Sequence, residues 1–314
     1  MSSPLVSICI PCHNAVPYVG AALESALAQT WSNVEIIVVN DGSTDGSGEV
    51  LAEFESRGVK VIHERCGSAA KARNRALREA GGDYIKFFDA DDLLSPEMVE
   101  KQMVRLKDRQ DAVASSEWGR FRDDLTGFQP NPQSVWRDME AAEWLVVAWA
   151  DARPMMQPGM FLIPREILAE AGPWDEELTL TDDFEFYARL LCHATQVLFT
   201  SGATLYYRSG IAGSLSARKS PEAIESACHS LLKGTAHLLE RRNDLAAKRS
   251  CANVLQDFIF TYYPNRPDLT AKMKARVREL GGSMLEPDGP PKYHLLRRWI
   301  GWRLAKRIQL LAGR

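Results

Sequence analysis

The sequence predicts an α/β fold in which a mostly parallel sheet is flanked by helices and followed by a helical C-terminal extension. Two observations support this prediction. Short apolar runs alternate with amphipathic stretches over the first third of the chain, which is typical of strand–helix–strand units. From Pro221 to Leu280 the apolar positions instead follow helical spacing. With 45% hydrophobic and 25% charged residues, the 314-residue chain has the composition of a folded globular protein.

Five short apolar runs are the predicted strands, and their composition suits strands that are buried on both faces. They are Leu5–Ile10, Val34–Val39, Val59–His63, Tyr84–Phe88 and Asp111–Ser115. Helices are expected between them, over Val19–Leu27, Asp45–Glu55 and Ala69–Ala80, with a fourth that begins at Ser95-Pro96. Right-handed crossovers would bring the carboxyl ends of the parallel strands to one edge, where such sheets bind ligands.

The pattern is weaker after residue 116. We expect a loop at Phe121–Arg137, then helices near 139–150, 164–171 and 182–192, and short strands at Gln196–Thr200 and Thr204–Arg208. The helical part breaks at Tyr263–Pro267, and a linker at Glu286–Pro291 leads to a last, basic helix. We therefore divide the chain into a domain over 1–216, with halves of about 1–115 and 116–216, a helical extension over 217–285, and a linker and basic amphipathic helix over 286–314.

Charge and apolar runs exclude several classes of protein. The net charge of −3 gives no general attraction to nucleic acid, so we expect no nucleic-acid partner. No apolar run approaches the roughly 18 residues of a membrane helix, and the first residues lack the basic region of a secretory signal. Cys9 and Cys12 match C-x-x-C, but Cys9 lies in a predicted strand rather than at a helix start. Reduced thiols in a cytoplasmic protein are the preferred interpretation.

Aspartates follow two of the predicted strands. The segment after the first strand, Pro11-Cys12-His13-Asn14, lacks the glycines of a dinucleotide site, and no Walker motif or H-E-x-x-H occurs. The second strand instead leads into Asn40-Asp41-Gly42-Ser43, and the fourth into Asp89-Ala90-Asp91-Asp92. Three carboxylates this close repel one another, and a hard cation such as Mg²⁺ or Mn²⁺ would relieve them. The alternatives are an acidic helix cap ahead of Ser95 and, for Asp41, turn formation alone.

Four segments in this order and spacing resemble the family 2 glycosyltransferases, which are inverting enzymes that use nucleotide sugars and have a GT-A, Rossmann-like fold. The resemblance covers roughly residues 5–216. It rests on Ser7–Asn14, Glu35–Asp45, Ala72–Ala76 and Gly82–Asp92, and later on Gly159–Arg165, Gly172–Glu177 and Thr181–Arg189. It implies that the half over about 1–115 binds the nucleotide and the half over about 116–216 binds the acceptor.

The resemblance also implies roles for single residues. Pro11, Asn14 and Asp41 would line the nucleotide pocket, with Asp41 on the base, and Arg73 would contact the nucleotide or its phosphates. Asp89 and Asp91 would form the family's D-x-D pair, with Asp89 near the ribose and metal and Asp91 as the direct ligand, whereas Asp92 would be structural. Asp183 would be the general base and Asp182 its neighbour, although both residue types also cap helices. Many relatives carry a His shortly after the position of Arg208 that can join the metal or diphosphate. This chain has none there, so either metal retention is weaker or Ser214 and water substitute for it.

The implied reaction moves a sugar from a nucleotide-diphosphate sugar, a UDP-sugar foremost, to a hydroxyl of a glycan or lipid-linked glycan, as in polysaccharide and cell-envelope biosynthesis. The implied cofactor is a divalent cation, Mg²⁺ or Mn²⁺. Two other functions stay open. One is an inactive glycosyltransferase-like module that binds carbohydrate or nucleotide. The other is a sugar nucleotidyltransferase, which would need a glycine-rich loop after the first strand.

The tail over Lys292–Arg314 carries seven Lys and Arg residues and no acid. Its apolar residues interleave with these cations at helical spacing, in a stripe made of Leu296, Trp299, Ile300, Leu304, Ile308 and Leu311. Such a helix can lie in a membrane interface. We therefore expect peripheral contact with the anionic inner face of the cytoplasmic membrane. The alternative is ordinary packing on the rest of the chain.

Overall fold

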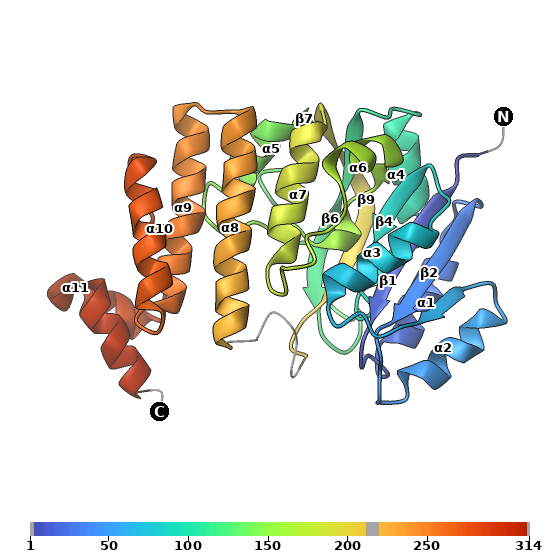
Figure 1. Cartoon of the computed structure of the whole chain (residues 1–314), viewed down its shortest axis with the longest axis horizontal. Helices are drawn as coiled ribbons and strands as arrows, with labels where there is room; N and C mark the ends of the chain where they lie inside the picture. The colour runs from blue at the N-terminus through green and yellow to red at the C-terminus, as the bar shows by residue number, and fades with distance from the viewer. Residues whose placement is uncertain (1–2, 212–219, 313–314) are drawn as a thin grey trace.

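The computed structural model describes residues 3–211 and 220–312. It contains two adjoining sheets with helices packed around them, followed by a row of helices that leads to the C-terminus (Figure 1). This arrangement confirms the predicted α/β fold with a helical C-terminal part. Within the described ranges, no helix combines the length and the apolar character needed to span a membrane.

The first sheet has the strand order β3-β2-β1-β4-β8, in which the first four strands are parallel and β8 is antiparallel to β4. The strands are β1 (Val6–Cys12), β2 (Val34–Asn40), β3 (Lys60–His63), β4 (Tyr84–Phe87) and β8 (Ile163–Pro164). Every residue of β4 and every residue of β1 except Pro11 is buried. The loops that follow β1, β2 and β4 therefore emerge at one edge, as expected for parallel strands.

The second sheet differs from expectation in two respects. The strand predicted at Asp111–Ser115 lies here as β6 (Ala112–Phe121) and continues six residues further, parallel to β9 (Gln196–Arg208). The two strands predicted near the position of β9 are one strand, because Glu117 accepts a hydrogen bond from the backbone of Gly202 (3.0 Å) and bridges an irregularity in the register. Two short strands, β5 (Leu93–Leu94) and β7 (Met139–Glu140), complete this sheet.

Helices of the first 200 residues follow the predictions closely, with one exception. They are α1 (Val19–Leu27), α2 (Ser47–Glu55), α3 (Ala69–Glu79), α4 (Met98–Leu106), α5 (Ala141–Ala148), α6 (Arg165–Ala171) and α7 (Asp182–His193), with the short 3-10 helix η1 (Pro158–Met160). Helix α4 begins at Met98 rather than Ser95. Ser95 is instead buried against β9, where its hydroxyl accepts from the backbone of Thr204 (3.0 Å).

The extension contains α8 (Pro221–Arg241), α9 (Leu245–Tyr262) and α10 (Pro267–Glu279). The helical part is also interrupted between α8 and α9, where no interruption was predicted. Asp244 caps the start of α9 there, because its side chain accepts a hydrogen bond from the backbone N–H of Ala247 (2.9 Å). Helix α8 packs directly on α7, and a Cβ atom at Gly234 would lie only 2.6 Å from the Phe184 ring. The extension thus supports the helix that carries the predicted acidic pair. The predicted boundary at residue 216 lies outside the described residues.

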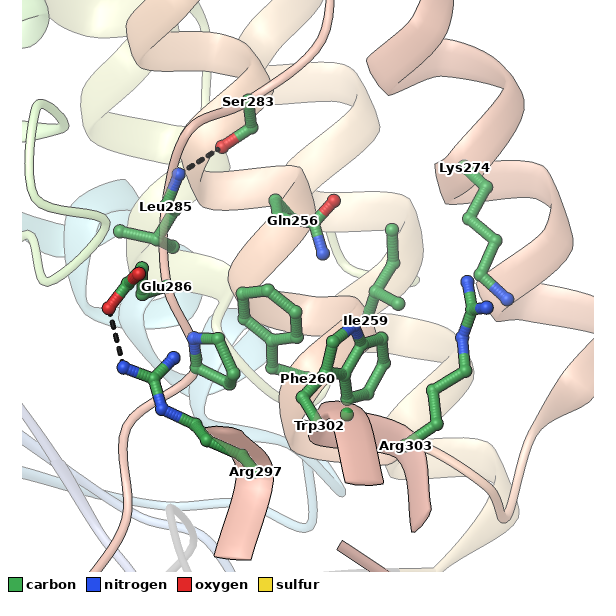
Figure 2. Close-up of a pocket in the computed structure, with 12 residues that line it drawn as sticks. Gln256, Ile259, Phe260, Lys274, Ser283, Leu285, Glu286, Arg297, Trp302 and Arg303 are labelled. Carbon is green, nitrogen blue, oxygen red and sulfur yellow. Dashed lines mark hydrogen bonds and ion pairs between the residues drawn. The ribbon is translucent and has the colours of Figure 1, made fainter. Parts of the chain in front are cut away.

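The last helix, α11 (Pro291–Ala312), is bent at Gly301, where φ is 76° and ψ is 157°, so the predicted continuous stripe is split into two halves. Its inner side is attached to the body by Trp302, whose ring packs against Phe260 (4.9 Å between centroids) and Tyr263 (5.1 Å). A pocket of about 480 Å³ lies beside this bend, between α9, α10, the 283–287 linker and α11 (Figure 2).

Candidate active site

Polar side chains join the loops that follow β1 and β2. Asn14 has a left-handed backbone (φ 48°), and its N–H donates to Ser43 Oγ (3.0 Å). The side-chain oxygen of Asn14 accepts from the backbone of Thr44 (2.8 Å). Pro11 lies one residue before the end of β1, opposite Val39 of β2. The structure therefore places Pro11 and Asn14 together at the carboxyl edge of the first sheet.

Asp41 connects this edge to the loop before α3. Its Oδ1 atom accepts from the backbone N–H groups of Cys66 (2.6 Å) and Gly67 (2.8 Å). Its other carboxylate oxygen has no hydrogen-bond partner among the described residues. The local turn is closed by its neighbour, since Asn40 Oδ1 accepts from the N–H of Ser43 (3.1 Å). The Asp41 carboxylate therefore has a role other than closing this turn.

The three aspartates after β4 have different surroundings. Asp92 is buried and accepts from the backbone N–H of Arg208 (2.8 Å), which is a structural role. Asp91 is half-buried, and this burial together with the negative charge of Asp89 raises its pKa to about 6. None of the three caps a helix, because the residue preceding α4 is Glu97 and no side chain caps that helix. The helix-cap alternative for this cluster is therefore wrong.

Arg73 of α3 joins the loop after β4 to the start of α7. Its side chain is only 6% exposed, and its two terminal nitrogens donate to Asp89 Oδ1 (2.7 Å) and Asp182 Oδ2 (2.9 Å). Its guanidinium carbon lies 4.4 Å from the ring centroid of Trp174. Asp89 and Asp182 consequently share one cationic partner. Arg73 thereby connects the predicted nucleotide-binding half of the domain to the predicted acceptor-binding half.

The acidic pair at the start of α7 is divided by this contact. Asp182 shares the charge of Arg73, whereas Asp183 takes part in no ion pair among the described residues. The Asp183 carboxylate accepts from the N–H of Phe184 (2.9 Å). Burial, and after it the charge of Asp182, raises the pKa of Asp183 to about 7. A carboxyl group with this pKa can accept a proton near neutral pH.

An aromatic cluster supports Arg73, and the sequence analysis assigned it no role. Trp174 stacks on Phe186 with 3.8 Å between ring centroids. The side chain of Asn74 both donates to the carbonyl of Trp174 and accepts from its N–H, each at 2.9 Å. One sequence signal was available, because Arg73 and Asn74 are surrounded on the buried side of α3 by small residues, namely Ala70, Ala72 and Ala76.

Lys86 is a second buried residue that the sequence analysis missed. It lies within β4, and its ammonium donates to the carbonyls of Gly159 (2.8 Å) and Phe161 (3.2 Å). Burial lowers its pKa to about 7. The signal was its place in Tyr84–Phe87, a strand buried on both faces. Lys86 thereby fixes η1 against the strand that leads to the acidic loop.

The site residues form two groups, one at the ends of β1 and β2 and the other around the end of β4 and the start of α7. Pro11, Asn14 and Asp41 lie toward β2, whereas Arg73, Asp89, Asp91, Asp182 and Asp183 surround the loop after β4 and the start of α7. Asp89 and Asp91 could hold a divalent cation. A cation there would relieve the repulsion from Asp89 that contributes to the raised pKa of Asp91, and Mg²⁺ in proteins commonly takes one or two carboxylates plus water and substrate phosphates. In the described ranges, no three His, Cys, Asp or Glu residues converge on one point to supply a fuller set.

The segment after Arg208 bears on the missing His. Arg208 donates from Nε to the carbonyl of Asp91 (2.7 Å), so β9 ends beside the acidic loop. The segment that follows β9 is the one in which many relatives carry the His. Ser214, the predicted substitute, lies outside the described residues.

This fold, with carboxylates in the loops at the carboxyl edge of its parallel sheet, is of the GT-A type. Residues 7–172 match the family model described as Glycosyl transferase family 2. That match covers more than half of the chain, and the chain therefore belongs to this family.

Two curated relatives illustrate the similarity. The uncharacterized glycosyltransferase EpsJ of Bacillus subtilis is 31% identical over 211 residues, which are 65% of this chain and 61% of EpsJ. The uncharacterized glycosyltransferase YibD of Escherichia coli is 30% identical over 211 residues, with 63% and 61% covered. The chain thus spans about three fifths of the length of these relatives.

Solved structures share the fold at low sequence identity. TarS residues 1–349 of S. aureus in complex with UDP match with a TM-score of 0.64 and 18% identity, over 84% of this chain and 73% of that one. The mannosyltransferase PcManGT of Pyrobaculum calidifontis, in complex with GDP-Man and Mn²⁺, matches with a TM-score of 0.53 and 17% identity, over 90% and 87%. These likenesses establish the fold.

Proposed function

We propose that this chain is an inverting glycosyltransferase that moves a sugar from a nucleotide-diphosphate sugar, with a UDP-sugar as the first candidate, to a hydroxyl of a glycan or lipid-linked glycan. The observation that carries the proposal is the divided acidic pair: Asp182 is bound to Arg73, whereas Asp183 has no ion-pair partner among the described residues and has a pKa of about 7. Family membership supports the reaction class, and the fold is that of proteins solved with UDP, UDP-GlcNAc and GDP-Man.

Donor binding is assigned to the carboxyl edge of the first sheet. The second carboxylate oxygen of Asp41 is free to accept from an N–H of the base, and Pro11 and Asn14 shape the loop beside it. Asp89 would lie near the ribose and the cation, with Asp91 as the direct ligand. In this proposal Arg73 holds Asp89 in place and also contacts the nucleotide or its phosphates.

The reaction is a single displacement. The acceptor hydroxyl attacks the anomeric carbon while Asp183 accepts its proton, and the bond from that carbon to the diphosphate oxygen breaks, so the configuration inverts. When bound, Mg²⁺ or Mn²⁺ would offset the negative charge that develops on the leaving diphosphate. Asp182, which accepts a hydrogen bond from Arg73, holds the start of α7, and its negative charge contributes to the raised pKa of Asp183.

The test is a panel of nucleotide sugars, assayed for release of nucleoside diphosphate with and without a mixture of glycan and lipid-linked acceptors. We expect acceptor-dependent release of UDP from one donor, and NMR of the product should show the inverted anomer. Release of pyrophosphate from a nucleoside triphosphate would favour a nucleotidyltransferase. Donor binding without any turnover would favour an inactive binding module. A retained anomeric configuration would contradict the role of Asp183.

A further inference from the structure

Exposed apolar side chains of the described residues are concentrated on α11. Trp299 is 83% exposed and Leu311 is 72% exposed, values far above those expected of residues that stabilise a fold. The others on this helix are Leu295, Ile300, Leu304, Ile308 and Leu310. Elsewhere in the described ranges such residues occur singly, for example Val104 on α4. Exposed apolar side chains gathered on one helix indicate an interaction site.

The exposed side belongs to a helix whose other side is already packed. Tyr293 and Ala305 are buried, and Trp302 contacts the rings of Phe260 and Tyr263. Figure 2 shows Trp302 directed into the pocket beside α9. Because these contacts fix the inner side, the outward residues are not available for packing against the body to which α11 is attached. This argues against the alternative of ordinary packing for the outer side.

The cations of α11 are mostly without acidic partners. Among the described residues, Arg297 pairs with Glu286 and His294 lies near Asp288. No ion pair there involves the remaining cations of the helix, which are Lys292, Arg298, Arg303, Lys306 and Arg307. The local charge is therefore strongly positive, although the whole chain has a net charge of −3.

Positive charge also accumulates at the bend. Lys274 of α10 and Arg303 of α11 both line the pocket and extend toward each other (Figure 2). Burial, followed by the charges of Arg303 and Arg278, lowers the pKa of Lys274. Cations brought together in this way favour an anionic partner.

We propose that α11 docks the protein on an anionic lipid surface, with Trp299, Leu304 and Ile308 inserted among the lipids and the neighbouring cations facing the headgroups. Apolar residues flanked by cations without acids match the composition of interfacial helices. A second copy of the chain fits less well, because a two-fold contact through this surface would place its cations against one another. The proposal is independent of the donor and of the chemistry assigned above.

The test is co-sedimentation of the full chain with vesicles. One set contains phosphatidylglycerol and phosphatidylcholine, and the other contains phosphatidylcholine alone. We expect binding to the anionic vesicles that weakens as salt is raised. The double variant Trp299→Gln, Leu304→Gln removes exposed side chains and should lower binding at least tenfold. The matched control Val104→Gln, Leu245→Gln alters side chains that are 62% and 70% exposed elsewhere and should bind as the unmodified protein does.

A second pair of variants tests the charges. Lys292→Gln with Arg298→Gln should weaken anionic binding about fivefold for each cation removed. Lys107→Gln with Arg78→Gln, two exposed cations outside α11, should leave it unchanged. Equal binding by the α11 variants and their controls, or no binding by any protein, would overturn the proposal. It would also be overturned if sedimentation velocity showed a dimer that the Trp299→Gln, Leu304→Gln variant disrupts.

Discussion

Replacing Asp91 by Asn tests the acidic loop most directly, because the amide keeps the shape of the carboxylate and removes its charge. Burial and the charge of Asp89 raise the pKa of Asp91 from 3.8 to about 6. A raised pKa means that the folded protein holds this proton more tightly than the unfolded chain does. The ionised carboxylate therefore destabilises the fold increasingly as the pH rises above 3.8, with the full cost reached above about pH 6.

The difference between these two pKa values corresponds to ~3 kcal/mol as an upper limit. The amide introduced by Asp91→Asn must also be solvated in the same half-buried place, so we expect a gain in unfolding free energy of ~1–2 kcal/mol at pH 8 without metal. For a chain of 314 residues that raises the Tm by ~1.5–3 °C. At pH 4 the gain should largely disappear, because most of the unmodified Asp91 is then protonated. Turnover should fall by at least ~10²-fold, as expected for loss of a group that offsets charge on the leaving diphosphate.

The assay is thermal unfolding in EDTA at pH 8 and pH 4, together with nucleoside diphosphate release in Mn²⁺ or Mg²⁺. Asp123→Asn, which alters an exposed carboxylate outside the site, should change neither quantity. A lower Tm for Asp91→Asn at pH 8 would refute the argument from charge repulsion. Undiminished turnover, either by this variant or by the EDTA-treated protein, would refute the metal assignment.

Three further predictions concern the groups around Arg73. Asp183→Asn should lower kcat by about 10²-fold or more with donor affinity intact, and an inactive Asp182→Asn beside an active Asp183→Asn would show that the base is the other residue. The kcat of the unmodified enzyme should fall as the pH drops through about 7, since Asp183 must be ionised to accept a proton; a flat profile from pH 5 to 8 would contradict this role. Arg73→Met should destabilise the protein by about 3 kcal/mol, because two carboxylates lose their partner, and an unchanged urea midpoint would show that solvent replaces the guanidinium.

The sequence was sufficient to predict the four parallel strands of the first sheet and the loops that carry its polar residues, but not β8, which is only two residues long. Apolar runs and turn residues are local signals, and the parallel order then places Asp41 and Asp89 at one edge. The same local signals missed the break before α9, which depends on a single cap by Asp244. They also missed the bend of α11, because Gly301 within an amphipathic pattern does not disturb the pattern itself.

Contacts between distant segments could not be predicted in the same way. Arg73 is separated by 109 residues from Asp182, and the resemblance implied only a contact of Arg73 with the nucleotide or its phosphates. The joining of two predicted strands into β9 depends on Glu117, which belongs to another strand. In each case the deciding partner lies far along the chain, where residue spacing carries no information about distance in space.

Under the proposed mechanism, the position of Arg73 has a consequence for how the acceptor specificity can vary. A displacement reaction requires the base and the leaving group to lie on opposite sides of the reacting carbon, at a separation that tolerates little change. Here one guanidinium determines the spacing between the loop after β4 and the first turn of α7. The loop between β6 and β7 can therefore vary in sequence and length, and so accommodate different acceptors, without altering the alignment of the reacting groups, whereas α8 is constrained because it packs on α7.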